Sequence, residues 1–275
     1  MPTQSLAARR AAFRKLHETG CFLIPNPWDA GSARLLRGLG FKALATTSSG
    51  FAWSRGHADH GMDVETVLAH CREIVEATDL PVNVDFEHGF SNDPDGLRNN
   101  VRRCVETGVA GLSIEDSTGD PSRPLYDFDE AVARIRAARG AIDASGEDVM
   151  LVGRAECFLT GHPDPLNESL KRLKAYAQAG ADCLFAPGAR SREQIAAIVQ
   201  AVAPKPVNVL VPSPVDFTLS DLEKIGVRRV SVGSALAGAA WGGFLRAARG
   251  LAEGRFDGFA DNATYPELNG LFGQS

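Results

Sequence analysis

Eight short runs rich in apolar and β-branched residues recur along the chain, and each is bounded by polar or turn-forming residues. Runs of about four to eight such residues are typical of buried strands. We therefore predict strands at 21–25, 42–47, 81–85, 110–115, 149–154, 182–187, 206–211 and 228–233.

Between these runs, apolar residues repeat at helical spacing. The segment AGSARLLRGLG places Ala33, Leu36 and Leu39 on one face and ends in glycine, which suits a left-handed C-terminal turn. DVETVLAHCREIVEAT begins with an aspartate cap, and later segments such as SREQIAAIVQAVA follow the same logic. Strands that alternate with helices indicate a mostly parallel sheet, and eight such units predict a (β/α)8 TIM-type barrel.

A doubly wound sheet is the main alternative fold. It usually carries a glycine-rich phosphate loop after its first strand, but here that place reads IPNPWDAGSA, which is neither GxGxxG nor a P-loop. We therefore predict one barrel domain over 1–275 with a C-terminal helical segment at 235–275. That segment opens with a helix rich in small residues, which either docks on a neighbouring subunit or serves as the eighth barrel helix.

Composition narrows the function classes. The net charge is −5, with no basic stripe for nucleic acid and no polybasic run for a membrane surface. No apolar run approaches the roughly 18 residues of a membrane span, and the N-terminus lacks the apolar centre of a signal peptide. We therefore expect a cytoplasmic protein. The five cysteines are odd in number and contain no CxxC, so we expect neither a disulfide framework nor a zinc site.

Polar residues gather at the predicted strand ends, where barrels of this class place their active sites. These residues follow apolar strands at one end of the barrel, so they should converge: Ser49, Gly50, Asp59, Asp85, Glu87, Glu115, Asp116, Arg154, Glu156 and Asn208. An oxygen-rich, sulfur-free ligand set favours Mg²⁺ or Mn²⁺. Such a metal would act as a Lewis acid on a 2-oxo acid and stabilise a developing enolate.

Each motif alone has a plain structural explanation. Asp85 and Glu87 are also suited to capping a following helix, and Arg154 to a structural ion pair. Together, at the ends of three successive strands, they favour a metal site beside an arginine whose donors bind a carboxylate or phosphonate. Ser49 and the amides near Gly50 would hold a second carboxylate. Phe51 is either core or part of the substrate wall.

Five motifs in order, over nearly the whole chain, carry a family resemblance: IPNPWDAGSARLLRGLGFKAL, SSG followed by AD, VDFEHG, SIED and GRAE. The chain resembles the isocitrate lyase / phosphoenolpyruvate mutase superfamily. The resemblance implies a barrel, bound Mg²⁺, 2-oxo acid or enolate chemistry, and dimers or tetramers that exchange the C-terminal helix. Position by position, it implies metal-shell roles for Asp59, Asp85, Glu87 and Glu115, and substrate contacts from Ser49, Gly50, Arg154 and Asn208.

Three departures from that family bear on the reaction. The lyases' KKCGH-type loop is replaced by STGDPSRPLYDF at 117–128, without its cysteine and without the asparagine of the mutases and phosphonate hydrolases. A histidine that the mutases use after the sixth strand is absent from FAPGARS. Glu87 replaces the commoner aspartate.

The sequence thus predicts an Mg²⁺-dependent lyase or decarboxylase. It would cleave a C–C bond in a small 2-oxo or 2-hydroxy di- or tricarboxylic acid, because decarboxylation requires mainly an electron sink and no thiol acid. We assign catalytic roles to Arg154, Glu115 and Asp59, metal ligation to Asp85, Glu87 and Glu115, and substrate contacts to Ser49, Gly50, Phe51, Arg154 and Asn208. The 117–128 loop would close over the site. A P–C bond mutase or hydrolase and a non-catalytic oxo acid binder remain the alternatives.

Overall fold

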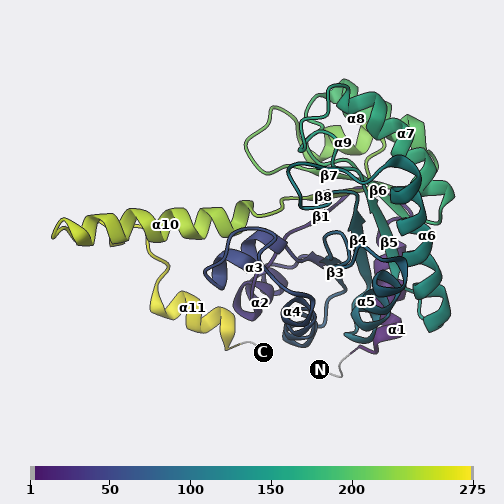
Figure 1. Cartoon of the computed structure of the whole chain (residues 1–275). Helices are drawn as coiled ribbons and strands as arrows, with labels where there is room; N and C mark the ends of the chain where they lie inside the picture. The colour runs from purple at the N-terminus through teal and green to yellow at the C-terminus, as the bar shows by residue number, and fades with distance from the viewer. Residues whose placement is uncertain (1–3, 274–275) are drawn as a thin grey trace.

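The computed structural model describes residues 4–273 and shows eight parallel strands in the order β1-β8-β7-β6-β5-β4-β3-β2 (Figure 1). The strands are β1 (Phe22–Ile24), β2 (Leu44–Ala45), β3 (Val82–Asp85), β4 (Gly111–Glu115), β5 (Met150–Arg154), β6 (Cys183–Phe185), β7 (Val207–Leu210) and β8 (Arg229–Ser231). The backbone N–H of Ala45 donates to the carbonyl of Pro25 at 3.0 Å and links β2 to the end of β1. The predicted (β/α)8 barrel is therefore confirmed.

The helices follow the strands in the expected alternation. They are α1 (Leu6–Leu16), α2 (Ala30–Gly38), α3 (Ser48–Ser54), α4 (Val64–Ala77), α5 (Pro94–Glu106), α6 (Phe128–Ser145), α7 (Pro165–Gln178), α8 (Arg192–Val202), α9 (Leu219–Ile225), α10 (Ala235–Ala252) and α11 (Tyr265–Phe272), with a short 3₁₀ turn η1 (Asp257–Phe259). Side-chain caps fix several starts; Asp29 and Ser191, for example, each form a capping box.

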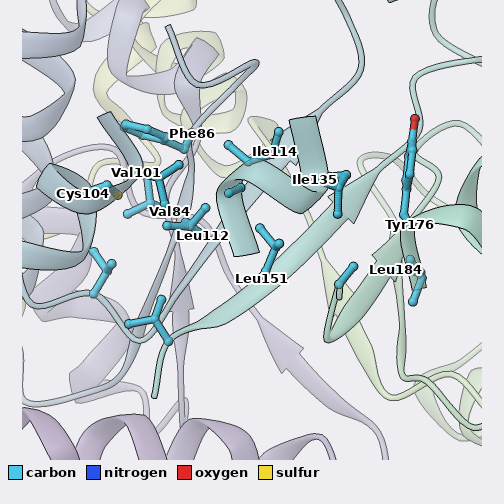
Figure 2. Close-up of a cluster of buried hydrophobic side chains, with 14 of the residues drawn as sticks. Val84, Phe86, Val101, Cys104, Leu112, Ile114, Ile135, Leu151, Tyr176 and Leu184 are labelled. Atoms are coloured by element: carbon cyan, nitrogen blue, oxygen red, sulfur yellow. The ribbon is translucent and has the colours of Figure 1, made fainter. Parts of the chain in front are cut away.

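The main core lies between the outer faces of the strands and the surrounding helices (Figure 2). Val84, Leu112 and Ile114 point outward from β3 and β4 and are buried against α5 and α6, which contribute Val101 and Ile135. This alternation leaves the intervening residues of each strand to line the barrel interior.

A second, smaller core closes the N-terminal end of the barrel interior. Phe13 of α1 packs with Ile24, Met150 and Cys183. Gly111 is required beside this plug, because a Cβ atom there would lie 2.8 Å from the Phe13 ring. Among the described residues, this cluster fills the N-terminal end of the barrel interior.

One predicted detail of the chain was wrong. The second strand ends at Ala45; of the two residues predicted to extend it, Thr46 lies outside regular structure and Thr47 caps the first turn of helix α3. The segment after residue 252 is partly helical, as predicted, and contains α11, which packs on α2.

Helix α10 projects away from the barrel (Figure 1). Only Ala237 and Gly250 of this helix are buried, whereas several large apolar side chains on it are exposed: Leu236, Trp241, Phe244, Leu245 and Leu251. Among residues 4–273, no helix is both long and apolar enough to cross a membrane.

Candidate functional site

Arg154, the last residue of β5, lies among three carboxylates at the open end of the barrel. Its Nη1 atom is 3.0 Å from Asp85 and 3.2 Å from Glu115, and its Nε donates to Glu156. The Phe185 ring lies beneath the guanidinium, with 5.4 Å between the Cζ atom and the ring centroid. Three carboxylates and a ring face hold this arginine in one orientation.

Asp85 ends β3 and is fixed from the neighbouring β2–α3 turn. Its backbone N–H donates to the Thr46 hydroxyl at 2.9 Å, and the Ser48 hydroxyl donates to its Oδ2 at 2.9 Å. The short second strand is what allows this contact, because α3 then begins with Ser48 directly over the end of β3.

Glu87 does not reach the site as a continuation of the alternating strand pattern that ends at Asp85. The strand has ended at Asp85, and Glu87 has a φ of +45°, a left-handed conformation that non-glycine residues adopt rarely and mostly where the surroundings impose it. Its carboxylate lies 3.0 Å from Nδ1 of His60. The hydrogen bond that His60 donates to the Glu87 carboxylate raises the pKa of His60 to about 9, so His60 is a cation at neutral pH.

The positive charge near the carboxylates at this end of the barrel is too small to balance them. Glu115 and Glu156 are 4% and 5% exposed. Burial raises the pKa of both, and repulsion from neighbouring carboxylates, Asp85 among them, adds to the shift, although Arg154 lowers it. Burial likewise raises the pKa of Glu87. The cluster would therefore gain from a further cation, which would keep its carboxylates ionised.

A cavity of about 220 Å³ opens beside Arg154 into the barrel interior. Its lining includes predicted site residues and additional polar ones: Asn26, Thr46, Ser48, Ser49, Asp59, Asn83, Asp85, Ser113, Arg154, Asn208, Arg229 and Ser231. Small size and a polar lining suit a small, highly charged acid, since cavities for drug-sized ligands are about 300–1,000 Å³.

Two predicted substrate residues lie outside this lining in the described structure. Gly50 is buried, and a Cβ atom there would lie 2.6 Å from the Thr47 methyl group. Phe51 stacks on His70 with 3.8 Å between ring centroids, in the packing between α3 and α4. The structure thus brings Ser49, Asp59, Asn208 and the acid–arginine cluster together, and places Phe51 in the core.

Asp116 turns away from the cavity toward α7. It accepts hydrogen bonds from the Tyr176 hydroxyl at 2.6 Å and from Arg172 at 3.0 Å, and its Oδ1 accepts the backbone N–H of Glu156 at 2.8 Å. This buried network positions Glu156, which in turn binds Arg154. Asp116 therefore supports the site without lining it.

The 117–128 loop forms a small hairpin closed by the bridge between Ser117 and Leu125. Tyr126 is buried, and its hydroxyl donates to Asn92 at 2.5 Å. Arg123 pairs with Glu130 on the exposed side. The base of the loop is thus anchored, and its exposed residues are those of the tip.

No three His, Cys, Asp or Glu side chains within 4–273 are grouped so as to hold a metal ion. In this structure the guanidinium of Arg154 contacts the carboxylates of Asp85 and Glu115 that were predicted as ligands. The donor chemistry nevertheless fits a hard divalent cation, because four clustered carboxylates face only Arg154 and His60.

Comparison with known proteins identifies the family. A family model for phosphoenolpyruvate phosphomutase matches residues 13–252. The chain belongs to this family. The wider phosphoenolpyruvate mutase / isocitrate lyase superfamily includes C–C lyases and decarboxylases, and its members are typically Mg²⁺-dependent.

Three relatives illustrate the similarity. A crystal structure of a provisionally named lyase/mutase from Burkholderia cenocepacia J2315 is 44% identical, with a TM-score of 0.93 over 98% of this chain and 97% of that one. The uncharacterized protein Rv1998c of Mycobacterium tuberculosis is 33% identical over 88% of this chain and 90% of its own length. An oxaloacetate decarboxylase of Paraburkholderia xenovorans is 34% identical over 70% of this chain and 66% of its own.

Sequence reasoning missed Arg229 as a site residue and gave His60 and Ser48 no role of their own, although Ser48 belongs to the SSG motif. His60 and Ser48 meet the acids only through turns whose course the sequence does not specify. Arg229 did carry a signal, since alternation along RRVSV places Arg229 and Ser231 on the same face of β8.

Proposed function

We propose that this protein is an Mg²⁺-dependent lyase or decarboxylase that cleaves a C–C bond in a small 2-oxo or 2-hydroxy acid with two or three carboxylates. The observation that carries the proposal is the contact of Arg154 with three carboxylates beside a small polar cavity at the open end of the barrel, which Arg154 and Asp85 line. The site combines a group that binds anions with a cluster that favours an added cation.

Asp85, Glu87 and Glu115 would hold the metal, with Asp59 at the cavity rim near enough to raise the pKa of Glu87. When bound, Mg²⁺ supplies Lewis-acid polarisation of the substrate's oxygen atoms. Asp85 and Glu115 would exchange their contacts with Arg154 for the ion. The arginine would then be free to direct its donors at the substrate.

Arg154 would bind a substrate carboxylate through two parallel N–H donors. Glu156 keeps its contact with Nε and so preserves the orientation of the guanidinium. Ser49 lies in the cavity lining and would donate to a second carboxylate oxygen. These contacts orient the bond to be cleaved and need no thiol acid, in keeping with the lack of cysteine in 117–128.

A turnover screen tests the proposal. Oxaloacetate, isocitrate, 2-methylisocitrate and phosphonopyruvate would each be incubated with the protein in Mg²⁺ or in EDTA, and products identified by mass spectrometry. We expect a C–C cleavage product from at least one acid in Mg²⁺ and none in EDTA. Full turnover in EDTA, or turnover of none of the C–C substrates, would contradict the proposal.

A P–C bond mutase or hydrolase is the second candidate, favoured by the match to the phosphoenolpyruvate phosphomutase family. The same arginine would face a phosphoryl group in place of a carboxylate. Turnover of phosphonopyruvate alone in the screen would establish it.

We further propose that the protein forms homo-oligomers through α10. Phe244 is 60% exposed and packs edge-on against Trp241, with 5.6 Å between the ring centroids. An exposed apolar face of this kind marks a protein interface. A second copy that exchanges this helix would cover it.

A further inference from the structure

Arg229 is a buried cation without a carboxylate partner. The residue is 3% exposed, and no ion pair joins it to any acid in residues 4–273. Its Nε donates to Asn208 at 2.9 Å and its Nη1 to Asn83 at 3.3 Å. Amide oxygens satisfy two donors but leave the positive charge uncompensated, which is costly inside a protein.

The charge lies deep in the same cavity that Arg154 lines. Arg229 is the first residue of β8, whereas Arg154 is the last residue of β5, so Arg229 lies nearer the closed end of the barrel. His17, from the helix that plugs that end, adds no second positive charge beside Arg229. Burial, assisted by the charge of Arg229, lowers the pKa of His17 to about 3, and the imidazole is neutral.

The surroundings of Arg229 are those of an anion site. Asn208 also donates its amide to the Ser231 hydroxyl at 2.9 Å, which fixes the amide oxygen toward Arg229. Ser231 lines the cavity with it and offers a hydroxyl donor, whereas the Ser113 hydroxyl, also in the lining, donates to the Val84 carbonyl at 3.4 Å. The cavity therefore presents the guanidinium of Arg229 and the hydroxyl of Ser231 to an anion that enters from the rim.

We propose that Arg229 binds a second carboxylate of the substrate at the cavity floor, while the rim holds the reacting end. This inference rests on the proposed function for the identity of the reacting end. It makes Arg229 the residue that selects acids with two or more carboxylates.

The carboxylate bound by Arg229 is one that the reaction retains. Binding to a carboxylate that leaves as CO₂ would stabilise the charge in the ground state and lose that interaction in the transition state, which slows cleavage. The bond that breaks is therefore not the one that joins this carboxylate to the rest of the substrate.

Binding of unreactive acids in the presence of Mg²⁺ tests this assignment without turnover. Succinate and butyrate have the same chain length and differ by one carboxylate. Calorimetry on the full chain should show succinate binding roughly tenfold more tightly or better, the size expected for charge-assisted hydrogen bonds. Arg229→Gln should remove this preference and leave butyrate binding unchanged, whereas Arg229→Lys should keep part of it.

Arg228→Gln is the matched control, because this adjacent arginine points toward the Gly20 carbonyl, away from the cavity lining. It should keep the wild-type preference. Circular dichroism would verify that each variant is folded, and Arg229→Lys provides the test if Arg229→Gln is not. Three results would each overturn the assignment. One is an unchanged preference for succinate in the Arg229 variants, and another is equal or no binding of the two acids by the wild type at millimolar concentration. The third is tighter binding of phosphonoacetate than of succinate. Because no turnover is measured, these results stand apart from failure of the lyase proposal.

Discussion

Replacement of Arg154 by methionine tests how the acidic cluster is held together. The substitution keeps an apolar stem above Phe185 but removes the charge that contacts Asp85, Glu115 and Glu156. Glu115 and Glu156 are almost fully buried, so water cannot replace the lost partner. Leaving a buried charge unpaired costs about 3–5 kcal/mol. We expect the free energy of unfolding at pH 8 to fall by about that amount.

The loss should shrink as the pH is lowered. Burial already raises the pKa of Glu115 and Glu156, and removal of Arg154 raises it further. An acid whose folded pKa is raised destabilises the fold as the pH rises through that value, so protonation near pH 5 restores part of the stability. Mg²⁺ should also restore part of it at pH 8, by about 2.7 kcal/mol when present at 100 times its Kd.

Urea unfolding followed by circular dichroism measures these changes. Arg102→Met is the matched control, because Arg102 pairs with Glu106 on the exposed surface of α5, where such pairs contribute about 0.3–0.5 kcal/mol. The control should show no such pH-dependent loss relative to the wild type, and Mg²⁺ should stabilise it as much as it stabilises the wild type. A loss below about 1 kcal/mol for Arg154→Met would refute the view that its charge holds the cluster.

Three further predictions address other parts of the molecule. Asp116→Asn removes the charged acceptor shared by Tyr176 and Arg172 and should lower the free energy of urea unfolding by about 3–5 kcal/mol; a change under 1 kcal/mol would contradict that role. Burial lowers the pKa of His70 to about 4, so its neutral form stabilises the fold above pH 6.5, and about 3 kcal/mol is lost as the pH falls toward 4. In unfolding measured across this range, His70→Phe should remove that part of the acid sensitivity, and an unchanged pH profile would disprove it. Phe244→Asp should shift the mass measured by light scattering toward the monomer; an unaltered mass would show that this face is not an interface.

The barrel was predictable from the sequence because each of its units carries a local signal. In the strand predicted at 149–154, for example, residues 149–152 are all apolar, since both faces are buried in a parallel sheet. The helices between the strands have an apolar stripe and recognisable caps. These signals depend on neighbours in the chain and hold in any fold that buries the same faces.

The arrangement of the site was only partly predictable. Asp85, Glu115 and Arg154 end predicted strands, so their convergence follows from the topology alone. The position of Glu87 depends on a left-handed turn, and the role of Ser48 on the early end of β2; both are decided by tertiary contacts. Phe51 follows the same turn but faces His70, because the first turn of α3 rotates it away from the cavity.

The most direct test of the central claim is the rate of pyruvate formation from oxaloacetate in Mg²⁺ and in EDTA, for the wild type, Asp85→Ala and Asp95→Ala. Asp95 lies exposed on α5 and serves as the control. Since free Mg²⁺ itself promotes this decarboxylation, the rate without protein is subtracted. The account predicts Mg²⁺-dependent turnover by the wild type and Asp95→Ala, abolished by EDTA and in Asp85→Ala. Turnover that persists in EDTA or in Asp85→Ala would contradict it.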